Sequence, residues 1–147
     1  MESRLTTVLD KLLLLSSLMA ADLDRFERDS GLTTARTHLL WVLGLSGPST
    51  QQTLAAALDV TPRNVTGLVD GLVTSGHVTR EPHPSDRRAI LVTPTAQGRR
   101  AIEDLRSSHA DVARQLFGDV PGARLDTFES TLDETIATFR RLMEESP

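Results

Sequence analysis

The sequence predicts a mainly α-helical fold that is interrupted by one small β-hairpin. Three observations support this fold class. Apolar residues recur at helical spacing through most of the 147 residues. One stretch, residues 77–92, instead alternates apolar and polar residues in two segments around a proline-containing turn. The long helices before and after this region carry more apolar surface than a small domain of this kind can cover by itself, which predicts a partner.

The first helix is expected over residues 3–28. Its leucine run is far shorter than the roughly 18 apolar residues that a membrane span needs. Acidic Glu2 and Asp10 flank the run, so we interpret the segment as an amphipathic helix and not as a signal peptide. We therefore expect a cytoplasmic protein that does not bind membranes.

The second helix is expected to be capped by Thr33 or Thr34 and to stop at Gly47-Pro48. Ser49 then stands where a third helix begins, and Gln52 follows at the spacing of a capping box. The second helix therefore precedes the central helical pair as a support helix, which gives three consecutive helices.

The stretch from Gln51 to Leu72 predicts two short helices joined by a tight turn. Thr61 is placed to cap the second of them, and Pro62 to open it. Its apolar residues, predicted to be buried, are Val65, Leu68, Val69 and Leu72. The opposite face shows Arg, Asn, Thr and Gly, which suits a DNA major groove. From these residues alone, an amphipathic pair in an ordinary helical domain is an equally good interpretation.

The hairpin is expected to have one strand over residues 77–80, a turn over residues 82–86 and a second strand over residues 87–92. A hairpin directly after a recognition helix is a wing, so the predicted fold is a winged helix-turn-helix. An arginine at the wing tip can enter the narrow minor groove of DNA. The alternative is a solvated hairpin with ordinary surface charges.

The net charge of −4 argues against nucleic acid, but its distribution argues for it. Residues 61–100 contain six arginines and three acidic residues, a local balance of +3 on a remainder of −7. Such a basic patch can bind phosphate while the acidic remainder limits non-specific binding. The chain has no cysteine, which excludes disulfides, thiolate metal sites and sensing through cysteine oxidation.

Two long amphipathic helices follow from Thr95 onward, separated by breaks at residues 117–118 and 121–122. Together with the first helix, they are expected to pair with a second copy of the chain. The candidate dimerisation residues are Leu5, Leu9, Leu12, Val112, Leu116, Leu125, Phe128, Leu132, Ile136 and Phe139. We expect residues 1–147 to form one domain, with a DNA-binding lobe over residues 32–93 and dimerisation helices over residues 1–28 and 95–145.

Residues 61–100 resemble the MarR family of bacterial transcriptional regulators, and the likeness extends over nearly the whole chain. Three features carry it: the pattern VT-x-LVD-x-L, the wing sequence Asp86-Arg87-Arg88, and the exit LVTPT-x-x-G into the next helix. The resemblance implies a homodimeric repressor or activator on a pseudo-palindromic operator. It also implies release from DNA by a small aromatic or anionic ligand.

By this resemblance, Arg88 is the minor-groove arginine, and Asp86 orients it or its neighbour. Positions in the helical pair are implied to read bases or contact the DNA backbone. The candidate DNA-binding residues are Gln51, Gln52, Thr61, Arg63, Asn64, Thr66, Arg80, Asp86, Arg87 and Arg88. Gly67 and Gly71 depart from the family, where larger residues are common, so the operator sequence stays open. Asp70 is expected to hold Arg63 or Arg80.

No metal site or cofactor is expected, because the four histidines are scattered and match no ligand spacing. The family location of a ligand pocket falls near Arg36, His38 and Trp41, although core packing is the default role of the tryptophan. No nucleophile elbow, phosphate loop or HExxH motif is present, so we do not expect an enzyme. The alternative function is a winged-helix adaptor that binds protein without specific DNA binding.

Overall fold

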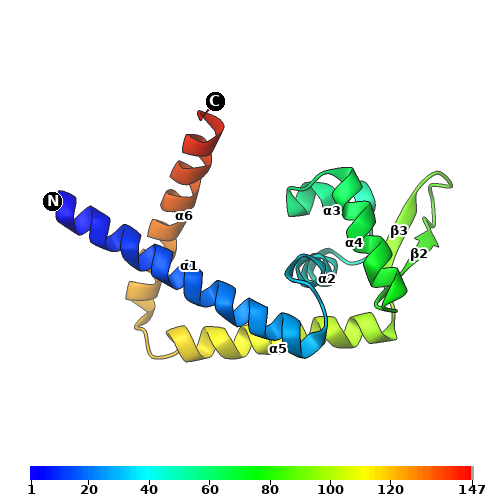
Figure 1. The fold of residues 1–147 in the computed structure, drawn as a ribbon, viewed down its shortest axis with the longest axis horizontal. Helices are drawn as coiled ribbons and strands as arrows, with labels where there is room; N and C mark the ends of the chain where they lie inside the picture. The colour runs from blue at the N-terminus through cyan, green and yellow to red at the C-terminus, as the bar shows by residue number, and fades with distance from the viewer. Residues whose placement is uncertain (147) are drawn as a thin grey trace. The chain divides into compact units, whose positions relative to one another are not determined.

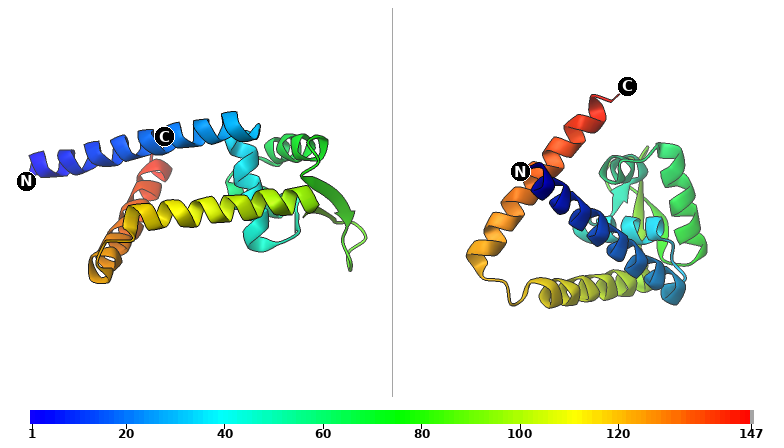
Figure 2. Two further views of the ribbon diagram at one scale, coloured as in Figure 1. Left: turned by 90° about the horizontal axis from the view of Figure 1, so that it is seen from below. Right: turned by 60° about the vertical axis from the view of Figure 1, so that its left-hand side comes forward.

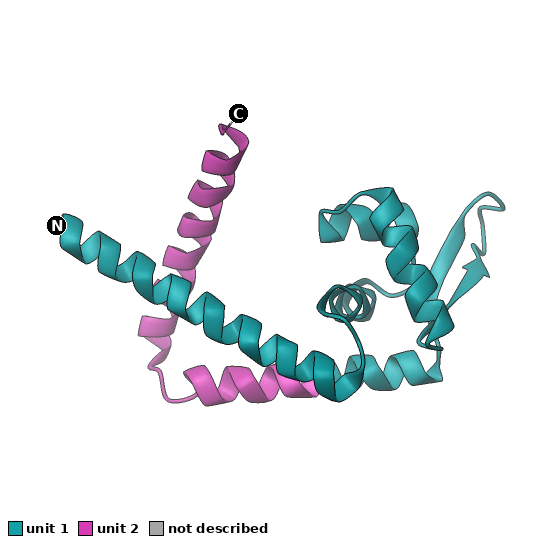
Figure 3. Ribbon diagram, viewed as in Figure 1, with its two compact units in different colours: residues 1–105 teal, residues 106–147 magenta. Residues whose placement is uncertain are grey.

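The computed structural model describes residues 1–146 and divides into two compact units, residues 1–105 and the residues from Arg106 onward (Figure 3). The boundary between the units falls inside a single helix, α5. Figure 1 shows the order of the elements, which confirms a mainly helical fold with a small sheet. They are α1 (Glu2–Ser30), α2 (Thr34–Ser46), β1 (Ser49–Thr50), α3 (Gln51–Leu58), α4 (Pro62–Thr74), β2 (Val78–Pro82), β3 (Ile90–Pro94), α5 (Ala96–Phe117) and α6 (Gly122–Glu144).

The core of the first unit lies where α2, α3 and α4 pack against one another and against the sheet. Val65, Val69 and Leu72 of α4 are fully buried and Leu68 is half-buried, which confirms the apolar stripe predicted for this helix. The first turns of α5 close the core with Ile102. The remaining buried apolar residues are Leu32, Leu39, Leu40, Leu43, Leu54, Ala55, Val78 and Val92.

The helix starts follow local capping chemistry. Thr33 Oγ1 accepts a hydrogen bond from the Arg36 amide at the start of α2, at 3.2 Å. Thr61 Oγ1 does the same for the Asn64 amide at the start of α4, also at 3.2 Å, and Pro62 is the first helical residue. These bonds confirm a cap at Thr33, one of the two candidates, and the cap at Thr61. Such caps can be predicted from sequence because the acceptor and the amide that it satisfies are only three residues apart.

The predicted cap of α3 was wrong by one residue. Thr50 is the cap, and its Oγ1 accepts from the Thr53 amide at 3.2 Å. Ser49 instead lies in β1, where its hydroxyl donates to the Gly47 carbonyl at 2.8 Å and its backbone pairs with Val92. This pairing with a strand more than forty residues away gives Ser49 an extended conformation and shifts the helix start.

The sheet has three antiparallel strands in the order β1-β3-β2, and the β2–β3 hairpin extends beyond the helices of its unit (Figure 2). The predicted second strand was wrong at its start, because β3 begins at Ile90 and not at Arg87. Arg87 and Arg88 lie instead in the loop between the strands. Side-chain hydrogen bonds to the loop backbone, including one from the Arg88 amide to Asp86 Oδ1 at 3.0 Å, hold these residues out of the ladder.

The junction of α4, β2 and α5 is close-packed. Thr95 donates its amide to the His77 carbonyl at 3.0 Å and its hydroxyl to the Gly76 carbonyl at 2.6 Å. Gly98, in the first turn of α5, lies against the same His77 carbonyl oxygen, and a Cβ at this position would overlap it. A glycine is therefore required here for close approach of two backbone segments.

His77 makes the stability of this junction dependent on pH. Burial lowers the pKa of its imidazole from the ordinary value of 6.5, because a charged ring would lose hydration there. Below pH 6.5 the unfolded chain binds the proton more readily, so the free energy of unfolding falls as the pH decreases. We expect His77→Asn to lose less stability than the wild type between about pH 7.5 and about pH 5.5, measured by urea denaturation. Equal losses would contradict this assignment.

The long helices outside the core expose many apolar side chains. Of the candidate dimerisation residues, only Leu12, Leu125 and Leu132 are half-buried; the others are exposed, up to 65% for Leu5 and 63% for Phe139. Neither α1 nor α6 contains a buried residue. Apolar surface of this extent marks an interaction site on a folded protein. Within residues 1–146, no helix combines the length and the apolar character needed to cross a membrane.

Candidate nucleic-acid interface

A network of polar side chains ties together α3, α4 and β2 on the surface that carries the predicted recognition helix. Arg80 on β2 forms an ion pair with Asp70 of α4, and its Nε donates to Gln51 Oε1 at 3.3 Å. The amide nitrogen of Gln51 then donates to Thr66 Oγ1 at 3.0 Å. The expectation that Asp70 holds one of two arginines is confirmed for Arg80. The acidic residue thereby neutralises a cation while fixing its position.

Beside this network, the first turn of α4 presents polar side chains to solvent. Thr61, Arg63, Asn64 and Thr66 are all exposed, and the N-terminus of the helix carries a partial positive charge. Thr66 also donates its hydroxyl to the Pro62 carbonyl at 3.0 Å, so its oxygen is held on the helix surface. The structure thus gathers the candidate residues of α4 at one end of one helix.

The loop between β2 and β3 is ordered by its own side chains. Asp86 Oδ1 accepts from the Arg88 amide, as described above, and the Ala89 amide donates to the Asp86 carbonyl at 3.2 Å. Asp86 therefore contacts the backbone of Arg88, and its predicted role in orienting the side chain of Arg88 or its neighbour stays a prediction. Both Arg87 and Arg88 are exposed.

A shallow groove runs between the start of α3 and the hairpin. Its volume is about 400 Å³, and two of the candidate arginines, Arg80 and Arg88, line it together. The remaining lining residues are Thr50, Gln51, Gln52, Ala89 and Ile90. Guanidinium groups beside amides and a hydroxyl can bind an anionic oxygen, such as a phosphate, by several hydrogen bonds at once.

The two unusual glycines of α4 have different surroundings. A Cβ at Gly67 would meet nothing within 4 Å, so no contact requires a glycine there. A Cβ at Gly71 would lie 2.5 Å from Nε of Arg36, because the guanidinium of this α2 residue packs against α4. Gly71 therefore lets Arg36 approach α4, whereas nothing in the structure explains Gly67.

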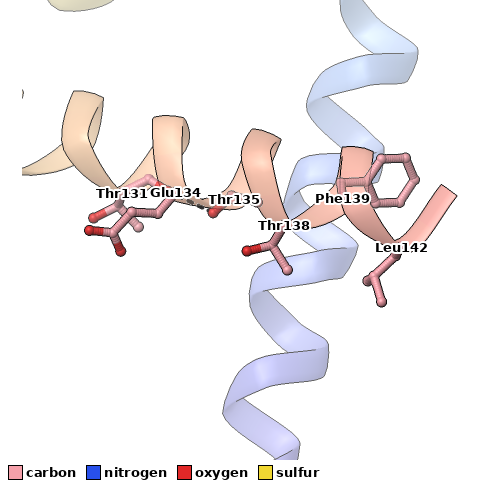
Figure 4. A pocket seen from close by; sticks show the side chains of 6 residues that line it. All are labelled: Thr131, Glu134, Thr135, Thr138, Phe139 and Leu142. Atoms are coloured by element: carbon pink, nitrogen blue, oxygen red, sulfur yellow. Dashed lines mark hydrogen bonds between the residues drawn. The ribbon is translucent and has the colours of Figure 1, made fainter. Parts of the chain in front are cut away.

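The residues predicted for a ligand pocket lie on α2. Arg36 and Trp41 are half-buried, and His38 is exposed. Neither of the two surface hollows described for residues 1–146 includes them. The second hollow lies on α6, where Phe139 and Leu142 lie beside polar side chains of the same helix (Figure 4). All residues that line this second hollow belong to one helix, which cannot enclose a ligand. The ligand pocket near Arg36 stays a prediction.

Sequence reasoning missed two residues that shape this surface. Thr50 caps α3 in place of Ser49, and His83 bonds to backbone amides in the hairpin loop. Ser49 and Thr50 both carry a hydroxyl that could cap α3, and the pairing of β1 with β3 decides that Thr50 is the cap. Within residues 1–146, no three histidine, aspartate or glutamate side chains are grouped so as to hold a metal ion.

The sequence model described as "MarR family" matches residues 30–89, which include α2, α3, α4, the strand β2 and the loop that follows it. Among curated relatives, the HTH-type transcriptional repressor YetL of Bacillus subtilis (strain 168) is 38% identical over 81 residues, covering 55% of this chain and 48% of that protein. A second regulator from the same organism is covered over 42% of its length, so the chain spans about half the length of these relatives.

Two solved structures extend the likeness beyond the central lobe. Streptococcus pneumoniae FabT in complex with DNA matches with a TM-score of 0.80 and 17% identity, over 97% of this chain and 99% of that one. CouR from Rhodococcus jostii RHA1 bound to p-coumaroyl-CoA matches with a TM-score of 0.64 and 28% identity, over 83% and 88% of the two chains. The first likeness shows that the fold of this chain is that of a winged helix-turn-helix protein.

Proposed function

Because this chain belongs to the MarR family, we propose that it is a transcriptional regulator that binds a specific site on double-stranded DNA. The observation that carries the proposal is the surface formed by the first turn of α4, the Asp70–Arg80–Gln51–Thr66 network and the hairpin loop. It groups exposed arginines with amide and hydroxyl groups, which are the side chains that contact phosphates and base edges.

The dimensions of α4 suit a major groove. A helix of 13 residues is about 20 Å long, and its N-terminal residues are those that reach base edges in this class of protein. Arg63, Asn64 and Thr66 would then face the bases, while Gln52 and Thr61 would contact the DNA backbone. Gln51 and Arg80 already bond to each other, so their role would be to hold the reading side chains in place.

We further propose that the chain acts as a homodimer on a pseudo-palindromic operator, and that it represses transcription in the cytoplasm. The exposed apolar faces of α1, α5 and α6 support pairing with a second copy. A two-fold dimer presents its two recognition helices to half-sites one helical turn apart. YetL, which is named as a repressor, supports the direction of regulation.

Release by a small anionic or aromatic ligand is part of the same proposal. CouR is a relative of this fold that binds an acyl-CoA. In this chain the guanidinium of Arg36 packs against α4 at Gly71, so an anion that pairs with Arg36 would remove that group from the recognition helix. The orientation of α4 would then respond to the ligand.

The proposal is tested by fluorescence anisotropy with duplex DNA from the gene's own upstream region, beside a scrambled duplex, at two salt concentrations. A salt-sensitive preference for the native duplex is expected. Equal and weak binding to both would contradict operator recognition. No binding even at low salt would favour the adaptor function over DNA binding.

Substituting the wing arginine gives a sharper expectation. Arg88→Ala should weaken binding to the native duplex by about 1–3 kcal/mol, because a minor-groove or phosphate contact is lost while the fold is kept. Arg141→Ala, which removes the same charge from an exposed position on α6, serves as the matched control and should leave the affinity unchanged. Equal affinities of the Arg88 variant and the wild type would remove the wing from the DNA interface.

A further inference from the structure

One nitrogen atom organises the tip of the hairpin loop. The Nδ1 atom of His83 accepts hydrogen bonds from the backbone amides of Ser85, at 3.1 Å, and Asp86, at 3.0 Å. The Ser85 hydroxyl lies 3.3 Å from the same nitrogen. The His83 amide donates in turn to the Ala89 carbonyl at 3.1 Å, which closes the loop. The imidazole therefore acts as the internal cap of a turn.

This arrangement is possible in only one state of the ring. A histidine nitrogen accepts a hydrogen bond when it carries no proton, so His83 must be neutral with its proton on Nε2. Protonation at Nδ1 would place a hydrogen against two amide hydrogens and break both bonds. A ring that carries a proton on Nδ1 therefore cannot hold this turn.

The turn is linked directly to the wing arginine. Asp86, whose amide bonds to the ring, accepts the Arg88 amide on its own carboxylate. The backbone path from His83 to Arg88 is thus fixed by consecutive side-chain hydrogen bonds. Loss of the first would release Asp86, and with it the position of Arg88.

We propose that His83 is a positioning residue for the DNA-binding wing, and that its neutral ring holds Arg88 in the orientation that meets DNA. This inference rests on the proposed DNA-binding function. The charged residues of the hairpin nearest to His83 in sequence are Glu81 on β2 and, in the loop itself, Asp86, Arg87 and Arg88. Both carboxylates already accept hydrogen bonds, Glu81 from the Thr79 hydroxyl at 2.8 Å and Asp86 from the backbone amide of Arg88 at 3.0 Å.

Two substitutions separate the acceptor from the titrating group. His83→Asn keeps an acceptor, because Oδ1 of asparagine is bonded to Cγ as Nδ1 of histidine is, and the amide does not take up a proton. His83→Ala removes the acceptor altogether. A side chain that only filled space or only supplied charge would not be rescued by asparagine.

The first measurement needs no DNA. On the intact 147-residue chain, labelled with 15N, the backbone amide signals of Ser85 and Asp86 are followed between about pH 5 and about pH 8 by NMR, with the His83 ring as reference. We expect both amides to move with the ring titration in the wild type, to be independent of pH in His83→Asn, and to be displaced at every pH in His83→Ala. Amides that ignore both the titration and the alanine substitution would overturn the proposal.

The second measurement uses the duplex from the upstream region, with scrambled DNA beside it. At the upper end of the pH range, His83→Ala should bind about two- to tenfold more weakly than the wild type, the effect of a typical net hydrogen bond, and His83→Asn should bind as the wild type does. Towards the lower end, the wild type should weaken relative to His83→Asn. A wild type that instead tightens relative to His83→Asn would show that His83 contributes only a cation, which overturns the positioning role.

The two measurements distinguish the possible failures. If the amides follow the ring but no variant prefers the native duplex, the proposed function fails, and control of the loop by His83 stands. If the wild type prefers the native duplex and His83→Ala binds it equally well at all pH values, the function stands and the inference about His83 fails.

Discussion

Replacing Gly98 by alanine is expected to lower the free energy of unfolding by about 3 kcal/mol, the upper range for inserting a methyl group into a filled site. The new Cβ would overlap the backbone carbonyl oxygen of His77, which already accepts the Thr95 amide. A carbonyl in the chain cannot rotate away as a flexible side chain can, so α5 or the connection from α4 to β2 has to move. Urea denaturation, with the slope and the midpoint both fitted, measures the loss.

Gly67 provides the matched control, since it is a helical glycine with nothing within 4 Å of an added Cβ. Gly67→Ala should raise the free energy of unfolding by about 0.5–1 kcal/mol, because alanine loses less backbone entropy in a helix. The two identical substitutions are thus expected to have opposite signs. A loss of similar size at both positions would show that the junction beneath Gly98 yields more easily than its packing indicates.

Placing a charge at Phe139 is expected to abolish the proposed homodimer. This side chain is 63% exposed in the single chain, so Phe139→Asp should change the fold of one subunit little. In a dimer built on the apolar stripe of α6, the carboxylate would be buried without a partner, at a cost that the interface cannot offset. Size-exclusion chromatography with light scattering should give the mass of one subunit.

Loss of the dimer should also reduce operator affinity by about 100-fold or more, because one subunit contacts only one half-site. Ala137→Asp is the control, as it adds the same charge to an exposed position on the opposite side of α6. It should leave both the mass and the affinity unchanged. If Phe139→Asp and Ala137→Asp were both monomeric, any added charge on this helix would be disruptive. If Phe139→Asp stayed dimeric, α6 would be excluded from the interface.

Local chemistry made part of this molecule predictable from its sequence. The caps at Thr33 and Thr61 and the apolar stripe of α4 follow from residues three or four apart, where competing arrangements are few. The pairing of Asp70 with an arginine was predictable because an exposed carboxylate beside a basic patch needs a partner. Which arginine it pairs with depends on how β2 lies beside α4.

Features fixed by distant parts of the chain were not predictable. β1 has only two residues, too few to show alternation, and exists because Ser49 and Thr50 pair with β3. The packing of Arg36 on Gly71 joins residues of two different helices, and no spacing signals it. His83 was recognised as a turn residue, but its role as an acceptor depends on the ring orientation and on the path of the loop. The contacts of the candidate DNA-binding residues with DNA stay predictions.

The bonds that join Arg80 to Asp70 and to Gln51, and Gln51 to Thr66, bear on how the proposed DNA specificity of this protein can change. Residues in one hydrogen-bonded set do not contribute independently, so a substitution at one of them alters the setting of the others. A new operator preference would therefore require coordinated replacement at several of these positions. Single substitutions would first produce variants that bind neither the original nor the new operator well. The recognition surface is expected to diverge among relatives in blocks, with residues 51, 66, 70 and 80 changing together.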